Sequence, residues 1–66
     1  MIREYQTTDE QFVSINLEAV ILAEDGRHGR TFVIMNGRPL TLRIDYADFV
    51  WEWKKYRHAN DEWEQR

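Results

Sequence analysis

The segment from Gly26 to Arg30, with the sequence GRHGR, carries the residue types in this 66-residue chain that best suit ligand binding. Arginine and histidine can donate hydrogen bonds to an oxyanion, and glycine lets the backbone approach a ligand closely. Two interpretations follow: a site that holds a nucleotide or another phosphate compound between subunits, or a solvated hairpin tip, which is the commoner case. The candidate anion-binding residues are Arg27, His28, Arg30, Arg38 and Arg43.

A second basic group lies near the C-terminus, where Lys54, Lys55, Arg57 and His58 stand beside aromatic residues. Basic side chains interleaved with aromatic ones are typical of surfaces that bind single-stranded nucleic acid. The net charge of −3 argues against a general nucleic-acid binder. A solvated helix face is therefore the favoured interpretation, and nucleic-acid binding is kept as an alternative.

Catalytic and metal-binding motifs are absent from the sequence. There is no cysteine, the two histidines are thirty residues apart, and Ser14 is the only serine. The sequence has no nucleophile elbow, phosphate-binding loop or zinc-binding helix motif. We expect a protein that is not an enzyme and that uses neither a cofactor nor a metal.

The N-terminal residues and the apolar runs bear on localisation. The first six residues are charged and have no apolar stretch of the kind found in signal peptides. The longest apolar run, Ala19 to Ala23, is far too short to cross a bilayer. We therefore expect a cytoplasmic protein that makes no contact with a membrane.

The pattern along the chain predicts one α+β domain over residues 1–66, a small antiparallel β-meander of four or five strands packed by one long C-terminal amphipathic helix. Apolar and β-branched segments, separated by turn residues, predict strands at about residues 2–7, 11–15, 19–24, 30–35 and 39–44. Asn16 to Glu18 should form a turn or a single helical turn. The helix should cover about residues 46–63, with Asp45 as its N-cap.

The Asn36–Gly37 pair predicts a hairpin between the last two strands, because both residues tolerate a positive φ. A strict two-residue loop would place Val33 opposite Leu40. A loop with a bulge at Gly37 would instead unite Phe32 and Ile34 with Leu40 and the later apolar residues on one face. We favour the bulged register, because a slip of one residue moves every side chain to the other face.

The predicted strands and helix carry more apolar surface than one small chain can bury. The strands at 19–24 and 30–35 are apolar on both faces, and one helix can cover only one face of a sheet. A chain of this size has a marginal core, and without disulfides or metals it is commonly stabilised by a partner subunit. We therefore expect a homo-oligomer, with an interface that includes Trp51, Trp63, Val33, Met35 and Ile21.

The order of elements resembles that of small flagellar and swarming-motility proteins of the FlbD type. The residues that carry the resemblance are Met1-Ile2, Phe12, Asn16, Val20, Glu24, Thr31, Asn36-Gly37 and the helix through Tyr56. The stretch Arg43 to Tyr46 and the tryptophan-rich helix depart from that pattern. The segment FVSINL is also similar to part of a LytTR-type DNA-binding domain, for which the chain is too short. The resemblance implies a role in interaction rather than catalysis.

These observations favour a small non-catalytic protein that oligomerises and docks onto a protein partner. Short proteins that lack cysteine and are rich in tryptophan are also compatible with inhibitors of host machinery encoded by phages or mobile elements.

Overall fold

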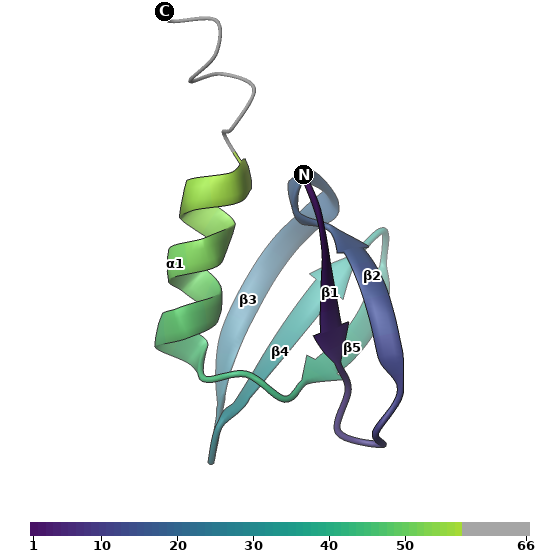
Figure 1. Ribbon diagram of the computed structural model, residues 1–66, viewed down its shortest axis with the longest axis vertical. Helices are drawn as coiled ribbons and strands as arrows, with labels where there is room; N and C mark the ends of the chain where they lie inside the picture. The colour runs from purple at the N-terminus through teal and green to yellow at the C-terminus, as the bar shows by residue number, and fades with distance from the viewer. Residues whose placement is uncertain (58–66) are drawn as a thin grey trace, which may run out of the picture.

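The computed structural model describes residues 1–57, which form five strands, one short 3₁₀ turn and one α-helix (Figure 1). The elements are β1 (Ile2–Gln6), β2 (Phe12–Asn16), η1 (Leu17–Ala19), β3 (Val20–Arg27), β4 (Arg30–Met35), β5 (Arg38–Leu42) and α1 (Tyr46–Arg57). The predicted α+β class, with an antiparallel meander followed by a helix, is confirmed.

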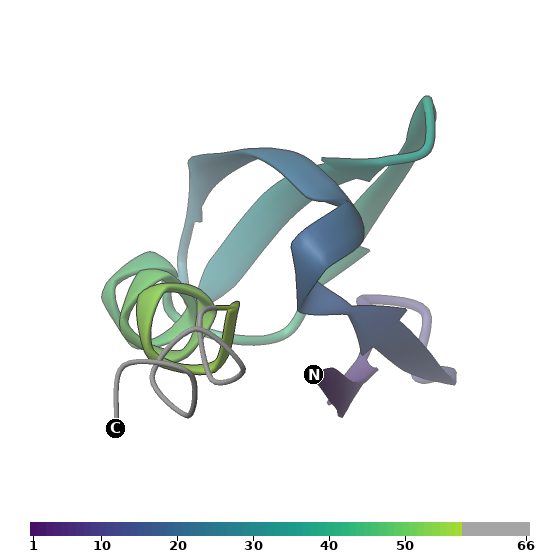
Figure 2. The same cartoon turned by 90° about the horizontal axis from the view of Figure 1, so that it is seen from above.

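The strands form two layers rather than one continuous sheet. β1 and β2 make an antiparallel hairpin, and β3, β4 and β5 make an antiparallel three-stranded sheet with β4 in the centre. The hairpin crosses in front of the sheet, and α1 lies along the side near β3 (Figures 1 and 2). The layers are joined where Thr7 bridges to Leu42 and where the Arg43 amide donates to the Gln6 carbonyl (2.7 Å).

The observed element bounds differ from the predicted ones at several ends. β3 continues to Arg27 instead of stopping at Glu24, and β5 ends at Leu42 instead of Ile44. The helix α1 has 12 residues within the described part of the chain. The remaining turns of the helix predicted to reach residue 63 lie outside the described residues.

The hairpin between β4 and β5 has the strict two-residue loop, so the favoured bulged register was wrong. Val33 lies opposite Leu40, and Met35 lies opposite Arg38. Asn36 and Gly37 have φ angles of 53° and 74°, as expected for the two central residues of a type I′ turn. Because both residues adopt this conformation readily, no bulge is needed and the strands twist together without splaying.

The core is a cluster of buried apolar side chains between the three-stranded sheet, the β1–β2 hairpin and α1. Its members are Tyr5, Ile15, Leu17, Val20, Val33, Leu42 and Phe49. Phe49 is the helix residue at its centre, with its ring centroid 5.5 Å from that of Tyr5 and 6.1 Å from that of Trp53. The Trp53 indole also donates to the Leu17 carbonyl (3.1 Å), which fixes α1 against η1.

The connection from the hairpin to the sheet depends on Asn16 and on an irregularity in β3. The Asn16 side chain accepts a hydrogen bond from the Glu18 amide (3.1 Å), which confirms the predicted helical turn at this position. Val20 then pairs with Met35 and Leu22 pairs with Ile34, so Ile21 is an extra residue without a partner in β4. This bulge leaves the Ile21 side chain 72% exposed.

The observed register predicts that two neighbouring truncations in β4 lower the free energy of unfolding by different amounts. In dilute solution, Val33→Ala should lower the free energy of unfolding by about 2 kcal/mol, because it leaves a cavity in a packed core. Ile34→Ala should cost less, although it removes one more carbon, because Ile34 lies on the other face. Chemical denaturation of both variants measures the difference, and a larger loss for Ile34→Ala would contradict the register.

Candidate functional site

The GRHGR segment forms the tip of the β3–β4 hairpin. Arg27 pairs with Arg30, and His28 and Gly29 make the two-residue turn with φ angles of 55° and 74°. Gly26 has no pairing partner, since the register shifts between Asp25 and Arg27. The whole segment is exposed, as the interpretation of a solvated hairpin tip requires.

The fold brings three of the five candidate anion-binding residues to one hollow and leaves the other two elsewhere. The hollow has a volume of about 370 Å³ and is lined by Thr8, Asp9, Glu10, His28, Gly29, Arg30 and Arg43. Arg27 lines a separate hollow of about 350 Å³ on the α1 side of the hairpin tip. Arg38 lies at the opposite end of β4 and β5, beside Met35, so the predicted set does not form a single site.

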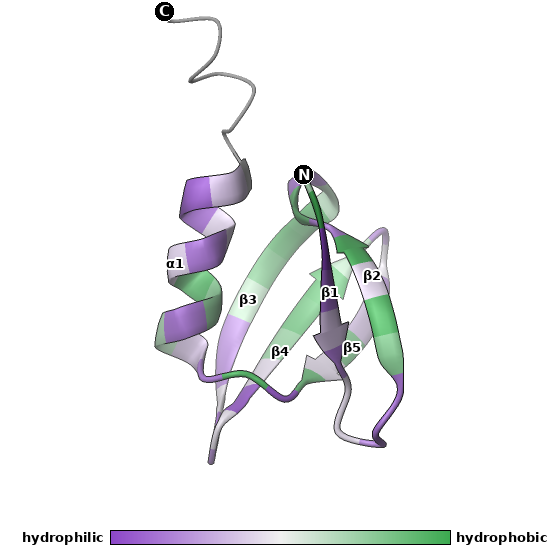
Figure 3. Cartoon of the chain, viewed as in Figure 1, coloured by the Kyte–Doolittle hydropathy of each residue, from purple (hydrophilic) through white to green (hydrophobic). Residues whose placement is uncertain are grey.

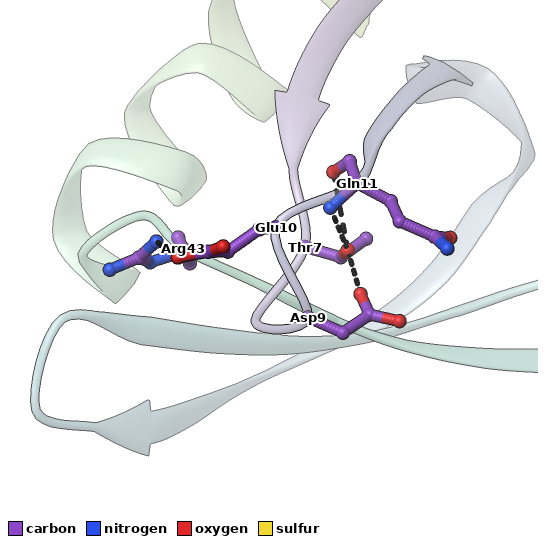
Figure 4. Close-up of polar contacts among 5 residues, drawn as sticks. All are labelled: Thr7, Asp9, Glu10, Gln11 and Arg43. Atoms are coloured by element: carbon purple, nitrogen blue, oxygen red, sulfur yellow. Dashed lines mark hydrogen bonds and ion pairs between the residues drawn. The ribbon is translucent and has the colours of Figure 1, made fainter.

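The turn between β1 and β2 places the Glu10 carboxylate against Arg43 and the Asp9 carboxylate against Thr7 (Figure 4). Glu10 has a φ of 67°, and its carboxylate lies 3.8 Å from the Arg43 guanidinium. The buried Thr7 hydroxyl contacts the Asp9 carboxylate and accepts from the Gln11 amide (3.2 Å), which fixes the turn. Two carboxylates therefore offset the charges of Arg30 and Arg43, so the hollow has no excess of positive charge with which to hold a phosphate.

The aromatic residues of α1 form a band with two cations. The Lys55 ammonium lies 4.5 Å from the Trp51 ring centroid, and the Arg3 guanidinium lies 4.5 Å from that of Tyr56. Trp51 and Tyr56 meet edge to face, with centroids 6.5 Å apart. Trp51 is 58% exposed, but Lys55 of its own chain already covers part of its ring.

Of the other basic residues predicted near this band, Lys54 is exposed. His58 and the side chain of Arg57 lie outside what the structure describes, and so does Trp63 from the predicted interface.

Tyr5 and Glu52 connect β1 to α1. The Tyr5 hydroxyl donates to the Glu52 carboxylate (2.8 Å), and the Arg3 guanidinium lies 3.6 Å from the same oxygen. Burial, and then the hydrogen bond and proximity to Glu52, raise the pKa of the Tyr5 hydroxyl well above its ordinary value of about 10. The contact is structural, since it holds the neutral phenol in place within the core.

The face of the three-stranded sheet that points away from the core is apolar. Leu22 and Pro39 both pair with Ile34, and Phe32 pairs with Thr41 and Glu24, which places these side chains on the face opposite Val33. We call this surface the outer sheet face and define it as Leu22, Phe32, Ile34 and Pro39 together with Ile21, the exposed bulge residue next to Leu22. Figure 3 shows β4 coloured mainly as hydrophobic, and β3 as hydrophobic over its first half and hydrophilic beyond it.

The predicted interface residues of the sheet differ in how far their side chains are exposed. Ile21 is exposed, and Met35 is half-buried against the core. The inclusion of Val33 in the interface was wrong, because its side chain is fully buried and cannot reach a second chain.

The sequence did not lead us to place Phe32 and Ile34 in the interface, because the favoured bulged register turned their side chains toward the core. The Asn36–Gly37 pair was the signal that could have found them, since it suits the unbulged type I′ loop best.

Comparisons with known proteins add no assignment: no family model matches the chain, and no curated protein or solved structure is significantly similar to it. Within residues 1–57, no group of three or more metal-ligating side chains is present. In the same part of the chain, no helix has the length and apolar character needed to cross a membrane.

The Tyr5 contact predicts a loss of stability in alkali. Because the folded state raises the Tyr5 pKa, the unfolded state releases its proton first, and stability should fall as the pH rises above about 10. Tyr5→Phe should cost about 1 kcal/mol at neutral pH, through the lost hydrogen bond, and should flatten this alkaline fall. Denaturant titrations from pH 7 to 11 measure both effects, and parallel pH profiles for the two proteins would contradict the assignment.

Proposed function

We propose that this protein is a small non-catalytic interaction protein that self-associates through its outer sheet face and acts by docking onto a protein partner. The observation that carries the proposal is the apolar outer face itself. Ile21 is 72% exposed and Leu22 is 37% exposed, while Phe32 and Ile34 are only half-buried beside them. Contiguous apolar surface of this kind is typical of interaction sites.

Burial of the outer sheet face favours association, but the size of this face limits the affinity. Each 100 Å² of apolar surface removed from water contributes about 2.5 kcal/mol, whereas association costs roughly 4–15 kcal/mol in lost freedom and ordering. Stable interfaces bury about 1,200–2,000 Å² in total. Five side chains on one sheet face fall below that size. We therefore expect reversible association in the micromolar range or weaker.

A second copy of the chain is the occupant that this face suits best. A twofold contact places the same surface on both sides, so the apolar side chains of one copy meet the same apolar side chains of the other. None of its five residues carries a charge, and Glu24, which pairs with Phe32, is the exposed charged residue that adjoins them on this face.

The two alternative functions have weaker support. The hollow at the β3–β4 tip contains Asp9 and Glu10 as well as Arg30 and Arg43, which does not favour a nucleotide or phosphate ligand. Lys55 already lies over Trp51, which leaves one side of that ring unavailable for stacking on a base. Self-association followed by docking on a protein is therefore the function we put forward.

Sedimentation equilibrium tests the proposal, with Ile21→Lys as the disruptive variant. The wild-type protein should gain mass over roughly 10–500 μM, and a buried Lys on the outer sheet face should weaken the association at least tenfold. Ile2→Lys is the matched control, because Ile2 is 68% exposed but lies on β1, away from this face. A wild-type protein that is monomeric throughout, or equal effects of the two variants, would refute the proposal.

A further inference from the structure

The strand β2 has one unpaired edge. Within residues 1–57 its one strand neighbour is β1. The hairpin begins and ends with hydrogen bonds from the Thr7 amide to the Gln11 carbonyl (2.7 Å) and from the Leu17 amide to the Met1 carbonyl (3.0 Å). Because bonded pairs alternate along an antiparallel ladder, Val13 and Ile15 also bond to β1.

It follows that the backbone amides and carbonyls of Phe12, Ser14 and Asn16 point away from the hairpin. In both views β2 lies on the side of the molecule away from α1 (Figures 1 and 2). These three residues are exposed, so their backbone groups form a row that another strand can reach.

The other strand edges are protected in ways that proteins commonly use against unwanted pairing. The outer edge of β1 carries the charged Arg3 and Glu4, and its Gln6 carbonyl accepts from the Arg43 amide. The edge of β3 carries the bulge at Ile21 and packs against α1. The edge of β5 carries Pro39, which has no amide hydrogen, and its Thr41 carbonyl accepts from the Thr8 amide (3.2 Å). β2 has no charged residue, no proline and no bulge over Phe12–Asn16. It is the undefended edge among residues 1–57.

We propose that β2 is a second self-association site, where β2 of another copy pairs antiparallel about a twofold axis at Ser14. This register places Phe12 opposite Asn16 of the second copy, Val13 opposite its Ile15, and Ser14 opposite its Ser14. All of these pairs are uncharged, and the Val13–Ile15 pairs are apolar on the side that faces the core layer. The strand is thus complementary to itself, which favours a second copy over a foreign strand.

This site is separate from the outer sheet face, because β2 belongs to the hairpin layer and the outer face belongs to β3, β4 and β5. Two different twofold contacts on one chain build assemblies larger than a dimer. The inference does not depend on the proposed outer-face contact, and the two can fail separately.

Amide hydrogen exchange of the wild-type protein, followed by NMR at several concentrations, tests the pairing residue by residue. The amides of Phe12, Ser14 and Asn16 should exchange freely in dilute protein and slow at least tenfold at concentrations where mass increases. The amides of Val13 and Ile15 serve as internal controls, because they donate to β1 and should be protected at every concentration. Unchanged exchange at Ser14 while the mass rises would overturn the proposal.

Ser14→Pro provides the matching variant. Proline removes an amide that points away from β1, so the hairpin should fold, as thermal unfolding can check, while the β2 contact is lost. Glu4→Pro is the control for the effect of a proline on the hairpin itself. Glu4 pairs with Ser14, and its amide points away from β2, just as the Ser14 amide points away from β1.

The masses of the variants separate the two contacts. Ser14→Pro should reduce the assembly to a dimer held by the outer sheet face, and Ile21→Lys should reduce it to a dimer held by β2. The double variant should be a monomer. A Ser14→Pro protein with the mass distribution of the wild type would exclude the β2 contact, whereas a wild-type mass for Ile21→Lys alone would exclude only the outer-face contact.

Discussion

The packing of Phe49 against Tyr5 and Trp53 draws α1, the hairpin and the three-stranded sheet together around one small core. The buried apolar side chains of residues 1–57 all belong to this core, and those from the sheet lie on its inner face. Within residues 1–57, one helix and one hairpin cover the three-stranded sheet, and both lie on the same side of it. The outer sheet face is the consequence, because β4 is apolar on both faces and only one of them is covered.

The polar contacts also hold the elements around this core. Glu52 holds β1 to α1 through Tyr5 and Arg3, and Glu10 lies against Arg43 beside the hairpin tip. The acidic side chains of the described residues thereby offset several of the basic ones that could otherwise attract an anion. Beside its exposed charged residues, the surface of residues 1–57 offers apolar side chains on one layer and a backbone edge on the other, and both suit association with protein.

The sequence was sufficient to predict the class of fold, the order of the elements and the turn at Asn16, because each follows from local preferences. The hairpin register was not predicted, since the choice between a two-residue loop and a bulge decides which face of β4 enters the core. That error placed Val33 at the surface and Phe32 inside. The bulge at Ile21 and the meeting of Glu10 with Arg43 depend on contacts between distant segments, which no local pattern records.

The central claim is that the outer sheet face is uncovered in a single chain and becomes covered only by association. Methyl NMR with a soluble paramagnetic agent measures this directly at low and high protein concentration. The account predicts that the methyl groups of Leu22 and Ile34 are strongly relaxed in dilute protein and become protected as the concentration rises, while those of Val33 and Leu42 are protected throughout. Protection of Leu22 and Ile34 in the dilute monomer, equal to that of Val33, would contradict it.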